Sequence, residues 1–239
     1  MTLLQLGIGT VNDLVDAPRD AGRKGGKPIP AGLVLASGAR VLAAACFALG
    51  VALAVAVSRP TGALALAVIA IGLAYDLRLK GTAWSWLPFA VGIPILPVFG
   101  WLGATGTLHP AFAILVPTSV VAGAALAIGN ALVDVERDRD AGISSIAVAL
   151  GARTASSLAV VLFGAIWLLA WSSALHSGGS WSGVAVITIG GLIPAAAATR
   201  AGAATSASRE RLWQVEAIGL AVLAAVWLAV ILGPSPRPA

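Results

Sequence analysis

Residues 33–57 read LVLASGARVLAAACFALGVALAVAV, an apolar run that is almost free of charge. A helix needs about 20 such residues, with a range of roughly 17 to 25, to cross the hydrocarbon core of a membrane. Similar runs follow along the chain at residues 61–74 (long enough to span when extended to residue 79), 84–103, 110–132, 154–175, 182–199 and 213–232. The pattern predicts an all-α fold, a polytopic membrane bundle with seven full transmembrane helices.

The composition of the whole chain supports this fold class. Of its 239 residues, 59% are hydrophobic and only 10% are charged. A soluble domain carries about 25% charged residues, so the composition excludes that class. Because no low-complexity linker interrupts the chain, we expect one transmembrane domain over residues 1–232 and a short disordered tail at 233–239.

The basic residues are distributed unevenly between the apolar runs. Segments 12–31, 75–83, 133–153 and 200–212 contain nearly all of them: Arg19, Arg23, Lys24, Lys27, Arg78, Lys80, Arg137, Arg139, Arg153, Arg200, Arg209 and Arg211. Loops rich in Lys and Arg face the cytoplasm, so we predict an integral protein of the cell inner membrane with these segments on the cytoplasmic side. The net charge of +5 therefore reflects topology, and no nucleic-acid partner is expected.

The N-terminal segment is an apolar helix of half length. Residues 1–11 would cover roughly 16 Å, about half of the hydrocarbon core. A charged amino terminus inside the core is costly. We therefore expect a natural form with about 40 more residues upstream, enough for one further helix and the missing half. A bundle that works with a shortened first helix is the alternative.

One polar motif occurs twice in this apolar chain. Residues 12–20 read NDLVDAPRD, and residues 130–138 read NALVDVERD. Both have the spacing N-x-x-x-D-x-x-x-D, and Arg-Asp-Ala-Gly closes each motif. Internal repeats in membrane proteins commonly place the functional site between the two halves. We therefore predict that both motifs contribute to one site.

The spacing of these motifs has a physical consequence. Residues four apart lie on one face of a helix, so Asn12, Asp16 and Asp20 form one stripe at a helix end. The second stripe consists of Asn130, Asp134 and Asp138. Like charges at this spacing destabilise an isolated helix by a few tenths of a kcal/mol per pair, so two facing stripes call for a counter-charge. Mg²⁺ binds one or two carboxylates together with substrate phosphates, which predicts Mg²⁺ bridged to a phosphorylated substrate. Alternatively, each acidic cluster solvates a helix end.

A third polar segment, YDLRLKGT at residues 75–82, lies at a helix end on the same predicted side. Its Lys80 is a candidate phosphate ligand and its Tyr75 a candidate phenolic donor, whereas Arg78 and Lys80 can also be ordinary membrane anchors. Lys27, in GKPIPAG, has the same two interpretations. For Arg209 and Arg211 we predict anchoring only.

These motifs resemble the three signatures of the UbiA superfamily of intramembrane prenyltransferases, which includes 4-hydroxybenzoate polyprenyltransferase-like enzymes. The segments that carry the resemblance are Asn12 to Asp20, Tyr75 to Lys80, and Asp134 to Asp138. In addition, KPIP at 27–30 is similar to an Arg-Pro-Ile-Pro loop of the family. The resemblance implies a bundle of nine transmembrane helices around a central cavity. It also implies Mg²⁺ between the acidic motifs, bridged to an isoprenyl diphosphate. The chain departs from the family in two ways. It has seven full helices and a half helix, and its second motif continues with Asp140, whereas many relatives have an acid at the position of Gly142.

The resemblance implies a prenyltransferase that moves an isoprenyl group from its diphosphate to an aromatic acceptor or another quinone or lipid precursor in the membrane. Catalytic roles then fall to Asp16, Asp134 and Lys80. The implied Mg²⁺ ligands are Asn12, Asp16, Asp20, Asp134 and Asp138. The implied substrate-binding residues are Asp13, Lys27, Tyr75, Arg78, Lys80 and Asn130. Membrane lipid surrounds the protein, and no obligate protein partner is expected.

The alternative function is a cation-coupled transporter that uses the repeated carboxylates. Transport sites lie near the middle of the bilayer on broken helices. In this chain every carboxylate except Glu216 falls in or beside a predicted cytoplasmic segment. This placement favours a substrate that approaches from the inner face.

Overall fold

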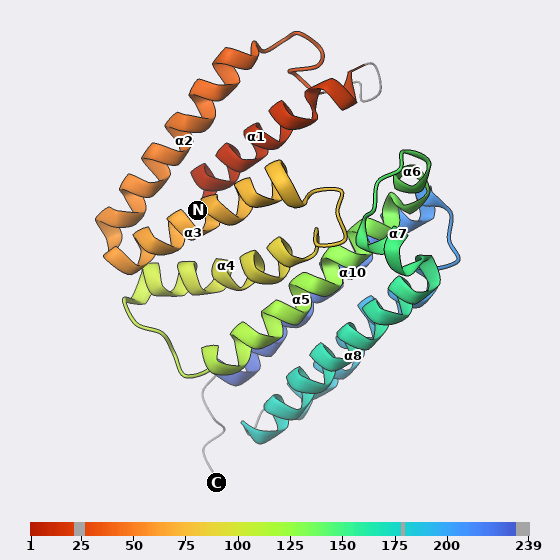
Figure 1. Ribbon diagram of the computed structural model, residues 1–239. Coiled ribbons are helices and arrows are strands. Elements are labelled where there is room, and N and C mark those ends of the chain that lie inside the picture. Colours follow the sequence, from red (N-terminus) through yellow and green to blue (C-terminus); the bar gives the residue numbers. More distant parts are fainter. Residues whose placement is uncertain (22–26, 178–179, 233–239) are drawn as a thin grey trace. The chain divides into compact units, whose positions relative to one another are not determined.

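The computed structural model describes residues 1–21, 27–177 and 180–232, and these form helices joined by loops, without a β-strand (Figure 1). The helices are α1 (Thr2–Asp20), α2 (Ala36–Val57), α3 (Arg59–Ala74), the π-helix η1 (Tyr75–Leu79), α4 (Leu87–Thr105), α5 (Phe112–Val133), α6 (Val135–Asp140), α7 (Ile146–Leu150), α8 (Ala152–His176), α9 (Trp181–Ala201) and α10 (Ser206–Leu232). Arg23, Lys24 and the tail predicted at 233–239 lie outside the described residues.

Seven of these helices are long and apolar enough to cross a membrane, which confirms the predicted fold class. They are α2, α3 continued through η1, α4, α5, α8, α9 and α10. Their ends lie within three residues of the predicted ends, because charged and turn-forming residues flank each apolar run, except that α10 begins at Ser206 and not at residue 213. Helix α1 is not among the seven, since its second half carries the acidic stripe.

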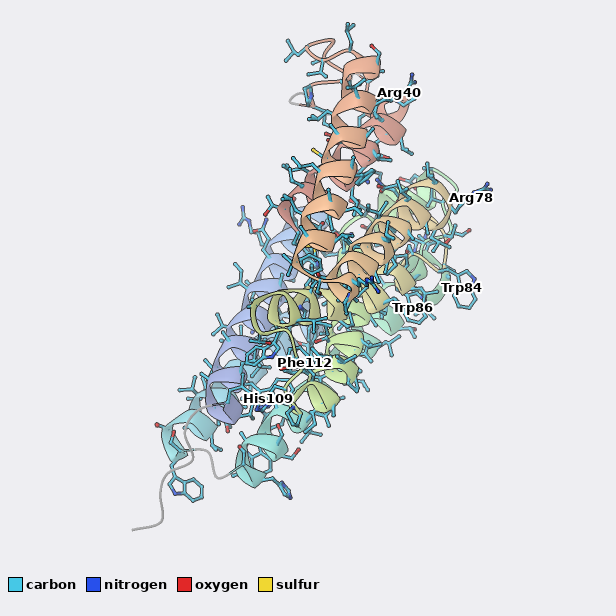
Figure 2. All side chains as sticks on the ribbon, turned by 90° about the vertical axis from the view of Figure 1, so that its left-hand side faces the viewer. Arg40, Arg78, Trp84, Trp86, His109 and Phe112 are labelled. Carbon is cyan, nitrogen blue, oxygen red and sulfur yellow. The ribbon has the colours of Figure 1, made fainter. Side chains whose placement is uncertain are left out.

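Large apolar side chains are exposed along the spanning helices. Val161 on α8 is 65% exposed, Ile189 on α9 67% and Ile218 on α10 65%. Figure 2 shows side chains that project outward along the whole length of the helices. Surfaces of this kind suit hydrocarbon, because lipid tails are as apolar as the side chains that meet them. The chain is an integral membrane protein.

The helices form two compact units. The first consists of Met1–Lys80 with Ile95–Leu108, and the second of Gly81–Pro94 with the chain from His109 onward. Helix α4 contributes its first half to the second unit and its second half to the first.

In the first unit, α1 packs closely on α2 and α3. Leu4 of α1 is fully buried, and a Cβ atom at Gly50 of α2 would lie 2.7 Å from its Cδ2 atom. A Cβ atom at Gly72 of α3 would lie 2.6 Å from Cδ1 of Ile8. Small residues let helix backbones approach in a membrane, so these glycines fix α1 against its neighbours. The second half of α1, with the acidic stripe, is thereby held beside the end of α3.

In the second unit, α5 packs against α8 and α10, while α9 packs against the same two helices. Phe163 of α8 and Ile187 of α9 are almost completely buried in this packing. A Cβ atom at Gly123 of α5 would collide with the carbonyl group of Phe89, so only glycine lets α5 approach the start of α4 this closely. This packing carries the end of α5, where the second acidic motif begins.

Candidate functional site

The first acidic motif lies on the second half of α1, as the spacing predicts. Asp16 and Asp20 are buried, and Asp13 is partly exposed. The ammonium group of Lys27 lies 2.8 Å from Oδ1 of Asp13, 2.9 Å from Oδ2 of Asp20 and 3.8 Å from Oδ2 of Asp16. Three carboxylates of the motif therefore converge on one positive charge.

Lys27 is a charged partner within this cluster. Burial acts to lower the pKa of Lys27, but hydrogen bonds to Asp13 and Asp20 outweigh it, and the pKa lies above its ordinary value. The ammonium group supplies the counter-charge that closely spaced carboxylates require. In this structure the ammonium group of Lys27 is paired with Asp13 and Asp20, and substrate binding by Lys27 stays a prediction beside the anchor interpretation.

Lys80 brings a second positive charge to the same motif. Its Nζ atom donates a hydrogen bond of 2.6 Å to Oδ2 of Asp16 and lies 6.0 Å from the centre of the Tyr75 ring. In an α-helix, residues five apart point about 140° away from each other. Here the backbone N–H of Lys80 donates to the carbonyl of Tyr75 at 2.8 Å, and this π-type turn brings the two side chains to one side. Lys80 thus binds Asp16 and lies over the ring of Tyr75.

Asp76 is a further acidic residue of this cluster, and the sequence reasoning missed it. It lies on η1, is only 4% exposed, and accepts a hydrogen bond of 2.7 Å at Oδ1 from Nδ2 of Asn12. Since the chain has only ten acidic residues, a carboxylate directly after Tyr75 in a polar segment is the signal that could have found it.

Arg78 is not brought to the motif by the described structure. Its side chain is exposed on η1 and projects away from the ribbon in Figure 2. Substrate binding by Arg78 stays a prediction, beside the alternative that it anchors the helix end.

The donor chemistry of the first motif fits a hard divalent cation. Such ions take carboxylate and amide oxygens, which Asn12, Asp16 and Asp20 provide. Within the described residues, no three acidic, His or Cys side chains stand ready as a metal cage. The ammonium group of Lys27 instead occupies the point on which the carboxylates converge. A metal cation bound by these carboxylates would therefore have to displace the ammonium group of Lys27 or bind beside it.

The second motif differs from the regular helical stripe that the spacing predicts. Helix α5 ends at Val133 and α6 begins at Val135, so the helix is interrupted at Asp134. Nη2 of Arg137 lies 2.7 Å from Oδ1 of Asp134, whose side chain is 43% exposed. Asp138 is half-buried on α6, and burial is the main cause that raises its pKa above the ordinary value. Asn130 is exposed on the last turn of α5.

A glycine ends α6 directly after the motif. Gly142 has a φ of 68°, the left-handed conformation that favours glycine. The N–H of Ile143 donates to the carbonyl of Asp138 at 2.8 Å, and the N–H of Gly142 donates to that of Arg139 at 3.1 Å. This pair of bonds is a Schellman motif. It gives a backbone reason for glycine at this position.

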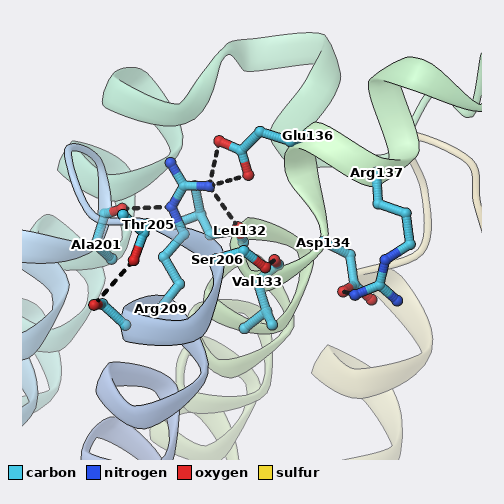
Figure 3. Close-up of polar contacts among 10 residues, drawn as sticks. Leu132, Val133, Asp134, Glu136, Arg137, Ala201, Thr205, Ser206 and Arg209 are labelled. Carbon is cyan, nitrogen blue, oxygen red and sulfur yellow. Dashed lines mark hydrogen bonds and ion pairs between the residues drawn. The ribbon is translucent and has the colours of Figure 1, made fainter.

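Arg209 contributes more than the membrane anchoring that the sequence predicts. Its guanidinium is buried, and Figure 3 shows its hydrogen bonds to the carboxylate of Glu136 and to the carbonyls of Leu132 and Ala201. Arg209 therefore joins the start of α10 to the ends of α5 and α9 and to α6. The position of Arg209 near the start of α10 gave no sign of its partner Glu136, which lies 73 residues earlier in the chain. Arg211, by contrast, is exposed.

The fold and these motifs define a class: an α-helical membrane protein with an acidic, lysine-lined site at the ends of its helices. The sequence matches the model of the UbiA prenyltransferase family over residues 1–216. The chain belongs to this family.

A named relative resembles part of the chain. It is 32% identical to the digeranylgeranylglyceryl phosphate synthase of Methanopyrus kandleri over 159 residues, which cover 65% of this chain and 57% of that protein. The match thus spans little more than half the length of that relative.

Solved structures share the fold. A digeranylgeranylglyceryl phosphate synthase superposes with a TM-score of 0.75 at 17% identity, over 96% of this chain and 82% of the other. A UbiA homologue from Archaeoglobus fulgidus bound to DMAPP and Mg²⁺ gives 0.72 at 21% identity, over 98% and 88% of the two chains. The apo structure of a UbiA homologue from Aeropyrum pernix K1 gives 0.71 at 18% identity, over 95% and 85%.

Proposed function

We propose that the protein transfers an isoprenyl group, in a Mg²⁺-dependent reaction, from a prenyl diphosphate to a lipophilic or aromatic acceptor in the membrane. The observation that carries this proposal is the meeting of carboxylates and ammonium groups at the end of α1. Asp13, Asp16 and Asp20 lie within 4 Å of the ammonium of Lys27, and Lys80 binds Asp16. A diphosphate bound through a metal needs both kinds of group in one place.

The acidic and basic residues of the site have different proposed roles. Asn12, Asp16 and Asp20 of the first motif and Asp134 and Asp138 of the second would hold Mg²⁺, which neutralises charge on a departing diphosphate. Lys80 and Lys27 would exchange their aspartate partners for diphosphate oxygens. Tyr75 is a phenolic donor beside Lys80, and Asp13, Arg78 and Asn130 are further candidates for substrate contact.

The reaction that follows is an alkylation. The bond between C1 of the prenyl chain and the diphosphate oxygen breaks, and the diphosphate leaves with the electron pair. A nucleophilic oxygen or carbon of the acceptor forms the new bond to C1, and the acceptor loses a proton. An apolar surrounding excludes the water that would otherwise capture the allylic cation.

The acceptor class is suggested by a relative. The matching protein of Methanopyrus kandleri is named a digeranylgeranylglyceryl phosphate synthase, and the A. fulgidus homologue is described as bound to DMAPP and Mg²⁺. A glyceryl phosphate lipid is therefore the first acceptor to test, followed by aromatic acids and phenols. The concentration of Lys and Arg in the segments that carry the motifs supports a site that opens to the cytoplasm.

The test is an assay of purified protein with labelled prenyl diphosphates of several chain lengths and a panel of these acceptors. We expect a prenylated product and one diphosphate released per product, both lost in EDTA. Absence of product with every pair, together with cation flux into vesicles that contain the protein, would favour the transporter instead.

A further inference from the structure

We infer that Asp76 is a positioning residue of the first acidic motif: it holds the amide group of Asn12 so that the amide oxygen stays available for a metal ion. The inference rests on the proposed function. It concerns a residue, inside the segment Tyr75 to Lys80, to which the family resemblance assigned no role.

The direction of one hydrogen bond carries the first step. Nδ2 of Asn12 donates to Oδ1 of Asp76 at 2.7 Å. A carboxylate accepts hydrogen bonds and donates none, so it selects the nitrogen side of an amide group that could otherwise turn over. The oxygen of Asn12 must then face away from Asp76. Since Mg²⁺ binds oxygen and not an amide nitrogen, this orientation decides whether Asn12 can be a ligand.

The second step is that Asp76 is itself held in place. It is 4% exposed and lies within the π-type turn closed by the hydrogen bond from Lys80 to the carbonyl of Tyr75. The same turn directs Lys80 to Asp16, at 2.6 Å. Asn12 and Asp16 are one turn apart on α1, so η1 contacts two successive turns of the motif. π-type turns occur frequently at functional sites.

The third step concerns the other oxygen of Asp76. Among the described residues, its buried Oδ2 atom has no hydrogen-bond partner. Burying an acceptor in this way costs free energy. A role limited to helix packing would be met better by a neutral side chain, whereas a carboxylate is the group that orients a metal ligand by accepting from its second polar atom. The orientation of the Asn12 amide therefore explains why a carboxylate stands at position 76.

The experiment measures metal binding without turnover. Purified protein is titrated with Mn²⁺ in the presence of inorganic diphosphate, and bound Mn²⁺ is followed by electron paramagnetic resonance. Loss of a residue that orients a metal ligand typically costs 10- to 100-fold in affinity. We expect Asp76→Asn to weaken Mn²⁺ binding about tenfold, because an asparagine at this position can also donate and lets the Asn12 amide turn over. The matched control is Glu210→Gln, which removes one exposed carboxylate from α10.

A second variant separates orientation from simple loss of a hydrogen bond. In the exchanged pair Asn12→Asp with Asp76→Asn, the new amide donates to the new carboxylate, which keeps an oxygen for the metal. We expect this variant to recover most of the Mn²⁺ affinity. Activity should follow the same order, with more Mg²⁺ needed for half-maximal rate in Asp76→Asn and a similar kcat at saturating Mg²⁺.

The outcomes are distinct. If the unmodified protein binds no Mn²⁺ with diphosphate, the proposed function is wrong. If it binds Mn²⁺ and a folded Asp76→Asn variant binds equally well, only the present inference is wrong. Should Asp76→Asn fail to fold, the exchanged pair decides: a folded exchanged pair that binds Mn²⁺ as poorly as Asn12→Ala contradicts the orienting role.

Discussion

Nη1 of Arg209 lies 2.6 Å from Oε1 of Glu136, and this ion pair joins the start of α10 to the segment that carries the second acidic motif. The arginine side chain is 5% exposed and the glutamate 53%. The same guanidinium donates to the carbonyls of Leu132 and Ala201, which close α5 and α9. A positive charge at the C-terminal ends of two helices also interacts favourably with the helix dipoles. Arg209 thus links the start of α10 to the end of α5, the end of α9 and the segment of the second acidic motif.

We predict that Arg209→Ala destabilises the protein by about 2–4 kcal/mol, since it leaves buried carbonyls without a donor and removes a buried partner of Glu136. Thermal unfolding of the purified protein in detergent measures the effect. Glu136→Gln should cost less than about 1 kcal/mol, because its carboxylate is half exposed.

The matched control for this prediction is Arg211→Ala, two residues further along α10 and exposed. It removes the same charge without a buried contact. Equal unfolding temperatures for the Arg209 and Arg211 variants would show that the ion pair of Arg209 has no structural role.

Activity should depend on both acidic motifs and on Mg²⁺. We predict that Asp16→Ala and Asp134→Ala each reduce product formation to background, because each removes a proposed carboxylate ligand of Mg²⁺. Asp16 is buried and paired with Lys80, whereas Asp134 is partly exposed and paired with Arg137. An enzyme that stays active in EDTA, or a fully active Asp134→Ala variant, would contradict the proposal that both motifs hold the metal.

The regular parts of the molecule could be predicted from the sequence. Apolar runs of spanning length predicted the seven spans. The spacing of four residues between Asn12, Asp16 and Asp20 predicted the stripe on α1, because α1 is an uninterrupted helix. The π-type turn at Tyr75–Leu79 could not be predicted, since its hydrogen-bond register departs from the 3.6-residue period. Asp76 was missed for the same reason.

Long-range contacts set the other limit on prediction. The second motif has the same spacing as the first, yet α5 ends at Val133. The carbonyl of Leu132 accepts from Arg209, which is distant in sequence. The pattern of residues 130–138 contains no sign of that partner, so spacing alone predicted a continuous helix.

Lys80 should act on substrate binding more than on folding. We predict that Lys80→Ala raises the KM for prenyl diphosphate about tenfold or more, since an ammonium that contacts phosphate oxygens contributes a charge-assisted hydrogen bond of roughly 1.5–3 kcal/mol. Lys80 follows the end of η1 and is not among the buried core residues, so we expect its loss to affect binding more than folding. Arg59→Ala, at the opposite end of α3, is the control for loss of a basic residue from this helix.

The anchor interpretation of Lys80 makes the opposite prediction. In that case Lys80→Ala would lower the amount of protein inserted in the membrane and leave the KM unchanged. Quantifying the protein in membranes beside the steady-state kinetics distinguishes the two results.

Gly142 should be needed for the backbone that ends α6. We predict that Gly142→Ala destabilises the protein by about 1–2 kcal/mol, because a side chain disfavours the left-handed conformation at φ 68°. A Cβ atom there would have no neighbour within 4 Å among the described residues, so the cost arises from the backbone and not from a collision. Gly142→Asn should cost less, since asparagine tolerates this conformation. Unfolding temperatures should therefore rank Gly above Asn above Ala, and an alanine variant as stable as the glycine protein would rule out a structural need for positive φ. If the end of α6 also orients Asp138, the alanine variant will require more Mg²⁺ for half-maximal activity than the asparagine variant.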